Sequence, residues 1–132
     1  MIALDTSAIV AIVHDEEDGQ VFSDLIVART AIVRTPTFLE ALMVLSKKLE
    51  GGAEDFFEHF LRPRQVRPVA FSLNMFRLAQ EALDTFGKGR HPKAALNFGD
   101  CMSYAVAKYH DAPLLFKGKD FIHTDIEPAI RP

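Results

Sequence analysis

The stretch Met1-Ile2-Ala3-Leu4-Asp5-Thr6-Ser7 opens the chain and decides how the rest of the sequence is interpreted. Its apolar residues 2–4 predict a short buried strand, and a helix is expected to begin at Ser7. Asp5 is therefore expected in the turn that leaves the carboxyl end of a strand, where open α/β sheets bind their ligands. The alternative is that Asp5, Thr6 or Ser7 only caps the helix, because all three residue types are favoured at that position. For Asp5 alone the capping interpretation is the stronger one, so the acids further along decide between the two.

The composition is typical of one globular domain spanning residues 1–132, with 48% hydrophobic and 25% charged residues. The longest apolar run, 8–13, is too short to cross a bilayer, and Met1 leads directly into a strand rather than a signal peptide, so we expect a cytoplasmic protein with no membrane contact. The single cysteine, Cys101, excludes an intrachain disulfide, and no Cys or His spacing indicates zinc. The net charge of −3 excludes a basic nucleic-acid coat, so contacts with phosphates must come from a local patch or through a metal ion.

Short apolar segments alternate with amphipathic ones along the chain. This alternation predicts an α/β fold with a parallel sheet that is covered by helices on both faces. Thr35-Pro36 predicts the start of one helix, and Gly51-Gly52 predicts its end. The expected strands cover 2–4, 31–34, 66–70 and 113–116, and the expected helices cover 7–14, 17–28, 36–49, 53–61, 73–86 and 99–110.

Glu40 lies one turn into the expected helix 36–49. Most of this helix is expected to be buried, and a buried carboxylate is costly unless it is paired, hydrogen-bonded or bound to a metal. The alternative, with equal weight, is that Glu40 lies on a solvated face with Lys47 at its far end. The main apolar stripe consists of Phe38, Leu42, Leu45 and Leu49, and the opposite stripe, which carries Glu40, holds Pro36, Met43, Val44 and Lys47.

Two further acids occupy comparable positions. Asp100 opens the expected helix 99–110 and points away from its apolar stripe of Met102, Ala105, Val106 and Tyr109. On its own side lie Ser103, Tyr104 and Ala107, which leave room for a ligand, although an acid in a first helical turn also interacts favourably with the helix dipole. Asp120 follows the last strand as Asp5 follows the first, whereas the nearby Asp125 is more simply interpreted as a turn residue.

The four acids Asp5, Glu40, Asp100 and Asp120 form a pattern that is more informative than any one of them. Two follow strands and two lie early in helices, so a parallel sheet can gather all four at one edge. Four converging carboxylates repel one another strongly without a cation. Oxygen-only ligands suit Mg²⁺ or Mn²⁺. The pattern therefore favours metal-assisted hydrolysis of phosphodiesters.

With these residues the chain resembles the PIN-domain ribonucleases, and specifically the VapC-type toxins of bacterial toxin–antitoxin pairs. The matching residues, which run nearly end to end, are 2–9, Glu40, Asn97-Phe98-Gly99-Asp100-Cys101 with Tyr104-Ala105, and 114–121. The resemblance implies a three-layer α/β/α PIN-like fold with a central parallel sheet and an acidic pocket that binds Mg²⁺ or Mn²⁺. It also implies endonuclease action on RNA, a homodimer that can enter larger toxin–antitoxin assemblies, and inhibition by a cognate antitoxin.

The resemblance assigns roles residue by residue. Asp5, Glu40 and Asp100 match the three constant acids of the family, and Thr6 or Ser7 matches the hydroxyl that supports the first acid. Many relatives carry an aspartate where Gly118 stands here, which leaves Asp120 as the nearest match to the fourth acid. For Asp120, direct metal binding, binding through water and no binding all stay open.

The sequence thus predicts a metal-dependent endoribonuclease toxin of a type II toxin–antitoxin pair. Lys117 and Lys119 flank Asp120, so we expect them to contact RNA phosphates. Six apolar residues are expected to be mostly core, with some available as a groove for an antitoxin helix: Phe22, Leu25, Ile26, Phe56, Phe57 and Phe60. The alternatives are another acidic-site nuclease and a non-catalytic PIN-like module that only binds a partner. The presence of Asp5, Glu40 and Asp100 at the matching positions argues against the binding module, which has no need of three such acids.

Overall fold

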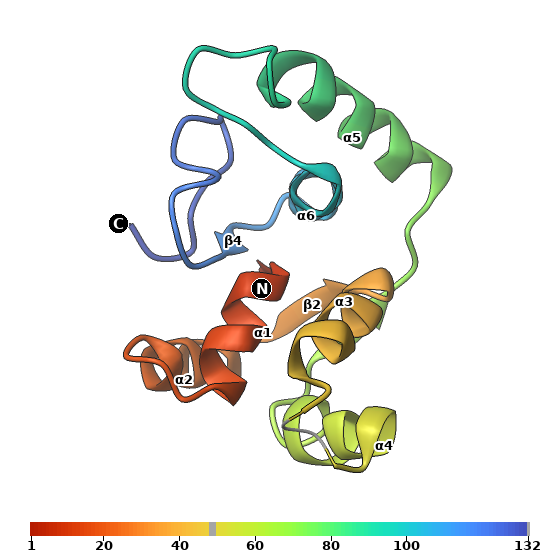
Figure 1. Ribbon diagram of the computed structural model, residues 1–132, viewed down its shortest axis with the longest axis vertical. Helices are drawn as coiled ribbons and strands as arrows, with labels where there is room; N and C mark the ends of the chain where they lie inside the picture. Colours follow the sequence, from red (N-terminus) through yellow and green to blue (C-terminus); the bar gives the residue numbers. More distant parts are fainter. Residues whose placement is uncertain (48–49, 132) are drawn as a thin grey trace.

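A computed structural model describes residues 1–47 and 50–131 and shows a parallel sheet between two layers of helices (Figure 1). The strands are β1 (Ile2–Leu4), β2 (Ala31–Arg34), β3 (Arg67–Val69) and β4 (Leu114–Leu115). Their spatial order is β3-β2-β1-β4, and each neighbouring pair is parallel, with Ile2 opposite Ala31 and Ala3 opposite Leu114. The parallel sheet that the sequence predicts is confirmed.

Alternate residues of the strands face two separate hydrophobic cores, as the period of two in a strand requires. Ile2 and Leu4 pack with α1 (Thr6–Val13), α2 (Gly19–Arg29), α3 (Pro36–Leu45) and α4 (Gly52–Phe56). Ala3 and Ile32 pack instead with α5 (Leu73–Phe86) and α6 (Phe98–Tyr109). Figure 1 shows the first four helices below the sheet and the last two above it. The predicted three-layer α/β/α arrangement is therefore confirmed.

Helix α6 is buried on nearly all sides, because it lies between the sheet and α5. Every residue from Asp100 to Ala107 is buried. The single apolar stripe expected for this helix is therefore wrong, and Tyr109, which belongs to that stripe, is 48% exposed. A helix enclosed in this way holds its side chains in fixed positions, which matters for the two polar residues that it contributes to the site.

Helix α3 is more exposed than the sequence indicates. It buries Thr37, Ala41 and Leu45, which follow one another at a spacing of four, whereas Met43 and Val44 face solvent. The expectation that most of this helix is buried is therefore wrong. It ends at Leu45, and the last residues of the expected helix, 48–49, lie outside the described residues. Beyond α4 the chain continues as a π-helical turn, Phe57–Leu61, and the other expected elements match with ends displaced by one or two residues.

The segment after β4 is held to the sheet at both of its ends. Residues 127–129 return alongside β4, where the N–H of Leu114 donates to Glu127 O (2.8 Å) and the N–H of Ala129 donates to Leu114 O (2.8 Å). The loop that carries Asp120 therefore lies at the carboxyl edge of the sheet, which is also where β1 ends. Across residues 1–47 and 50–131, no helix is long and apolar enough to pass through a membrane.

Candidate active site

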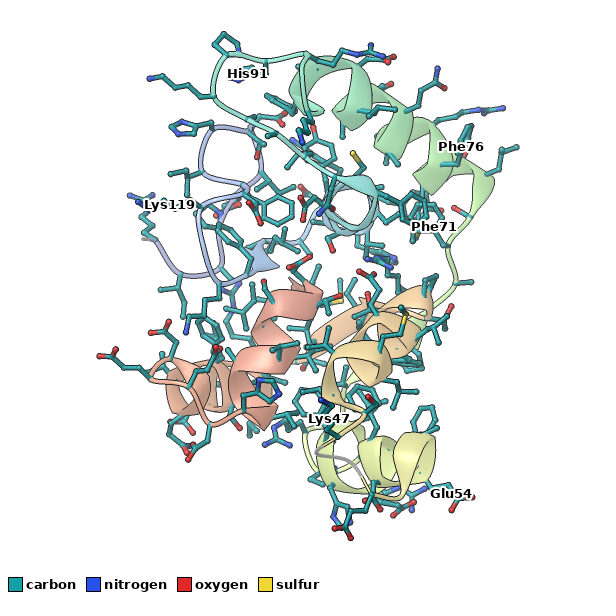
Figure 2. The ribbon with its side chains drawn as sticks, in the orientation of Figure 1. Lys47, Glu54, Phe71, Phe76, His91 and Lys119 are labelled. Atoms are coloured by element: carbon teal, nitrogen blue, oxygen red, sulfur yellow. The ribbon has the colours of Figure 1, made fainter. Side chains whose placement is uncertain are left out.

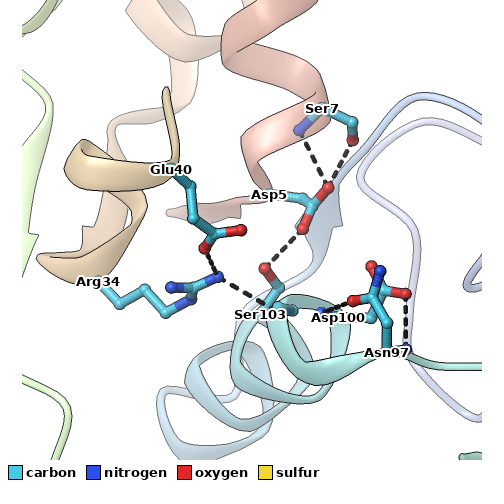
Figure 3. Close-up of polar contacts among 8 residues, drawn as sticks. Asp5, Ser7, Arg34, Glu40, Asn97, Asp100 and Ser103 are labelled. Carbon is cyan, nitrogen blue, oxygen red and sulfur yellow. Dashed lines mark hydrogen bonds and ion pairs between the residues drawn. The ribbon is translucent and has the colours of Figure 1, made fainter. Parts of the chain in front are cut away.

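Asp5 lies where β1 ends and α1 begins, and three hydrogen bonds fix its carboxylate. Its Oδ2 accepts the backbone N–H (3.0 Å) and the hydroxyl (2.6 Å) of Ser7, and its Oδ1 accepts the hydroxyl of Ser103 from α6 (2.6 Å), as Figure 3 shows. Asp5 is 7% exposed. Asp5 therefore caps α1 and also lies at the carboxyl edge of the sheet, so the capping interpretation does not exclude a position in the site.

Two hydroxyl-bearing residues follow Asp5, and they have different surroundings. Ser7 donates to Asp5 and accepts the backbone N–H of Lys117 (3.0 Å). The hydroxyl of Thr6 is buried and has no hydrogen-bond partner within the described chain. Of the two residues that the resemblance offers as support for Asp5, Ser7 is thus the one in contact with it.

Asp100 is held by a reciprocal cap at the start of α6. Its Oδ2 accepts the N–H of Asn97 (3.0 Å), and its own N–H donates to Oδ1 of Asn97 (2.9 Å). Burial raises the pKa of Asp100 to about 6 against an ordinary value of 3.8, although the bond from Asn97 opposes this change. The charges of Asp5, Asp120 and Glu40 each raise this pKa further. Asp5, Glu40 and Asp120 therefore all lie within electrostatic reach of Asp100.

Glu40 forms an ion pair that the sequence analysis missed. Nη2 of Arg34, the last residue of β2, donates to Oε1 of Glu40 and to the backbone oxygen of Gly99 (3.2 Å) (Figure 3). Arg34 is 1% exposed, whereas Lys47 lies beyond the far end of α3 (Figure 2). The available signal was an arginine that ends an otherwise apolar strand six positions before Glu40.

Gly99 allows the carboxylate of Glu40 to approach the start of α6. A Cβ added to Gly99 would lie 2.7 Å from Oε2 of Glu40, which is closer than such atoms approach in proteins. One oxygen of Glu40 thus contacts Arg34, and the other lies against the backbone beside Asp100. Figure 3 shows Asp5, just after β1, between Glu40 on α3 and Asp100 at the start of α6.

Asp120 is exposed and lies in the loop after β4. It lies near enough to Asp100 to raise the pKa of that residue. Gly118 has a φ of +102°, a backbone conformation that side chains other than glycine rarely adopt. An aspartate at 118 would therefore be strained in this loop.

The two lysines beside Asp120 differ in their contacts. Lys117 forms ion pairs with Glu16 (3.3 Å) and Asp18 (3.7 Å), so its charge is shared with the segment between α1 and α2. Lys119 is exposed and points outward from the loop (Figure 2). Lys119 is therefore the more available of the two to an incoming phosphate.

Other residues singled out in the sequence make structural contacts. Asp125 accepts the hydroxyl of Tyr104 (2.7 Å) and pairs with Lys108 (2.8 Å), so the hydroxyl of Tyr104 is already engaged. Ser103, Tyr104 and Ala107, which were expected to leave room for a ligand, are all buried. The apolar residues expected to be mostly core are so: Phe22, Ile26, Phe56 and Phe60 are buried. Phe57, 42% exposed, is the member of this set that a partner helix can reach most easily.

The four acids fit a divalent cation in charge and in ligand type. They supply hard carboxylate oxygens, and within the described chain only Glu40 of the four forms an ion pair with a basic side chain. Their arrangement fits less closely, since among residues 1–47 and 50–131 no three Asp, Glu, His or Cys side chains are grouped so that they can hold one ion. The ion pair with Arg34 holds the carboxylate of Glu40, which is one physical reason why the acids are not grouped more tightly.

Comparison with known proteins identifies the family of this site. The sequence profile of the PIN domain matches residues 2–127. The chain belongs to the PIN domain family. It is of the VapC type: it is 40% identical to ribonuclease VapC30 of Mycobacterium tuberculosis, over 99% of this chain and 100% of that protein. It is also 38% identical to ribonuclease VapC of Mycolicibacterium smegmatis, over 95% of this chain and 97% of that protein.

Solved structures share the fold of this VapC-type chain. Mycobacterium tuberculosis VapC20, described as a toxin that cleaves the sarcin–ricin loop, superposes with a TM-score of 0.72 at 18% identity, with 100% of both chains covered. A chain of a toxin–antitoxin complex from Klebsiella pneumoniae superposes with a TM-score of 0.69 at 12% identity, over 95% of this chain and 93% of that one. At these identities the likeness establishes the PIN fold that the sequence analysis predicts.

Proposed function

We propose that this chain is the toxin of a type II toxin–antitoxin pair, a metal-dependent endoribonuclease that hydrolyses RNA phosphodiesters at the carboxyl edge of its sheet. The observation that carries this proposal is that Asp5, Glu40 and Asp100 lie close together at that edge, where their like charges repel: Ser103 of α6 holds Asp5, and Glu40 lies against Gly99 beside Asp100. The names of its relatives as ribonucleases support the substrate class. A purely partner-binding module gains nothing from such mutual repulsion.

Asp5, Asp100 and Glu40 would hold Mg²⁺ or Mn²⁺, with Asp120 contributing from the outside. Bound there, such an ion lowers the pKa of a water molecule and neutralises charge on the phosphate. Ser7 and Ser103 keep both oxygens of Asp5 in place, and Asn97 does the same for one oxygen of Asp100. Side chains fixed in this way need little reorganisation when substrate binds. Lys119, exposed on the loop, guides the RNA backbone toward the acids.

We take residues 1–132 to act as one domain. The proposed partners of this domain are a cognate antitoxin and a second copy of the chain. The antitoxin inhibits by placing a basic side chain, most suitably arginine, among the acids, since a guanidinium matches clustered carboxylates. The second copy covers the exposed apolar side chains of α3 and α5, among them Leu39, Met43 and Phe76, which are 54–72% exposed. Such residues are typical of the centres of protein interfaces.

The deciding experiment is RNA cleavage by the purified chain with Mn²⁺, with and without chelator. Asp5→Asn and Asp100→Asn keep the size of the side chain and remove its charge, so each is expected to lower the cleavage rate by at least about 100-fold. Asp24→Asn, at an exposed position of α2, is the matched control and should cleave like the wild type. Full cleavage by Asp5→Asn, or cleavage that survives chelation, contradicts the proposal.

A growth assay tests the biological role. Expression of the chain should arrest growth, and a co-expressed antitoxin should relieve the arrest. Asp5→Asn should abolish the arrest while the protein accumulates to the same level. Undiminished toxicity of Asp5→Asn would instead indicate that the chain acts by sequestering a partner.

A further inference from the structure

The guanidinium of Arg34 is an unusual feature of the acidic site, because it is a permanent cation with almost no access to water. Its side chain is 1% exposed, and a single nitrogen, Nη2, makes both of its hydrogen bonds. Nε and Nη1 are buried and have no partner within the described chain. A buried charge with unsatisfied donors is costly unless an anion stays beside it. Arg34 therefore depends on Glu40.

Glu40 does not depend on Arg34 in the same way. Its side chain is 38% exposed, so water can solvate the carboxylate when the arginine is absent. Its second oxygen lies against Gly99, next to Asp100 and on the side of the other acids. The carboxylate of Glu40 therefore lies between the guanidinium of Arg34 on one side and the proposed metal position among the acids on the other.

The charges of the site determine how Arg34 affects the binding of a divalent ion. Arg34 balances one of the four acids, and within the described chain Asp5, Asp100 and Asp120 form no ion pair with a basic side chain. A divalent ion that recruits Glu40 must weaken its pairing with Arg34 and must also approach a fixed positive charge. Both effects oppose binding of the ion, and neither requires any partner protein.

We propose that Arg34 is an internal counter-cation that competes with the divalent ion for Glu40 and thereby sets how tightly the acidic site binds that ion. This role rests on the proposed function, since it concerns the same metal site. In the metal-free chain Arg34 neutralises Glu40 and holds it beside Gly99. Arg34 is a positioning residue, because it acts on the reaction through Glu40.

Titration of the metal-free protein with Mn²⁺, followed by calorimetry and by the electron paramagnetic resonance of free Mn²⁺, tests the proposal. Arg34→Met keeps the length of the side chain and removes its charge, so it should bind Mn²⁺ about tenfold more tightly than the wild type. Arg34→Lys keeps the charge and should bind within about threefold of the wild type. Arg62→Met, which removes an arginine from the exposed pair with Glu58, is the matched control and should leave affinity unchanged.

A second measurement, the free energy of unfolding without metal, tests the dependence of Arg34 on Glu40. Glu40→Gln should strongly destabilise the wild-type chain, because it leaves a buried guanidinium without an anion. The same substitution should have little effect in an Arg34→Met background. Glu58→Gln, in the exposed pair, should be nearly silent in either background.

The two measurements together separate the role of Arg34 from the existence of the metal site. Tighter Mn²⁺ binding by Arg34→Met together with the background-dependent effect of Glu40→Gln supports the proposal, and if Arg34→Met does not fold, Arg34→Gln carries the same expectation. Equal or weaker binding by the charge-free variants, with normal binding by the wild type, overturns the role of Arg34 alone. A wild type that binds no Mn²⁺ overturns this role and the proposed metal site together.

Discussion

The hydroxyl of Ser103 on α6 donates to Oδ1 of Asp5 at the end of β1 over 2.6 Å, although the two residues are 98 positions apart in the sequence. Asp100 lies one turn earlier on the same helix, so α6 supplies one acid and holds another. Because Ser103 is 1% exposed, water does not compete for this bond. The relative positions of Asp5 and Asp100 thus depend on the packing of a single helix.

Ser103→Ala should therefore affect both stability and activity. Loss of a buried bond to a charged acceptor should lower the free energy of unfolding by about 2 kcal/mol. Cleavage should fall by about tenfold or more, because Asp5 loses the partner that orients one of its oxygens. Urea unfolding and initial cleavage rates measure the two effects, with Ser46→Ala at an exposed position as the control. A wild-type rate for Ser103→Ala would show that this bond does not orient Asp5 for catalysis.

In the metal-free chain, Asp100 should contribute stability that is lost as the pH rises from about 4 to about 6. The pKa of Asp100 is about 6 in the folded chain against an ordinary 3.8, so the folded state binds the proton more tightly. This contribution is fully present below the ordinary value and is lost as the pH passes through the folded value. Asp100→Asn should flatten the dependence and melt at a higher temperature than the wild type at pH 7.5 without metal. Thermal melts across this range decide it, with Asp24→Asn expected to follow the wild type.

Gly99→Ala should displace the carboxylate of Glu40, since the added Cβ would lie 2.7 Å from Oε2. We expect a cleavage rate about tenfold lower, with a modest loss of stability because the contact is with the end of a flexible side chain. In an Arg34→Met background the carboxylate of Glu40 is released from its ion pair and can move aside, so Gly99→Ala should cost less stability there than in the wild type. An equal loss in both backgrounds would place the clash elsewhere.

Asp120→Asn should lower the cleavage rate substantially, by about tenfold, and less than Asp5→Asn does. Part of the loss should be recovered at high Mn²⁺, because the three other acids can still hold the ion. The measurement is a set of cleavage rates for both variants across a Mn²⁺ titration. A flat profile equal to that of the wild type would exclude Asp120 from the site.

Phe76→Lys should weaken the proposed homodimer, because it places a charge on an apolar side chain that is 54% exposed on α5. Sedimentation velocity over a range of concentrations should show a dimer for the wild type and mostly monomer for the variant. Val27→Lys is the matched control: Val27 is 66% exposed on α2, in the opposite helical layer. A dimer that survives Phe76→Lys but not Val27→Lys would place the interface on α2.

The sequence was sufficient to predict the sheet because each strand follows a local rule. Ile2 and Ala31 begin short apolar runs that end at turn or cap residues, and parallel pairing follows from the helices between them. The enclosure of α6 was not predictable from its own sequence, because Asp100 and Ser103 are polar residues whose burial depends on distant partners. The ion pair of Arg34 with Glu40 was missed for a related reason, since a strand and a helix must first be packed before the two side chains meet.

The hydroxyl of Ser7 carries a mechanical consequence. It donates to Asp5 and accepts from the backbone of Lys117, so a single oxygen atom ties the segment after β1 to the segment after β4. A displacement of the second segment is therefore transmitted to the carboxylate of Asp5 through this oxygen. The backbone N–H of Asp5 also donates to Leu115 O (3.0 Å), so exchange of Ser7 for alanine would leave the strands paired and remove only the coupling that runs through the carboxylate.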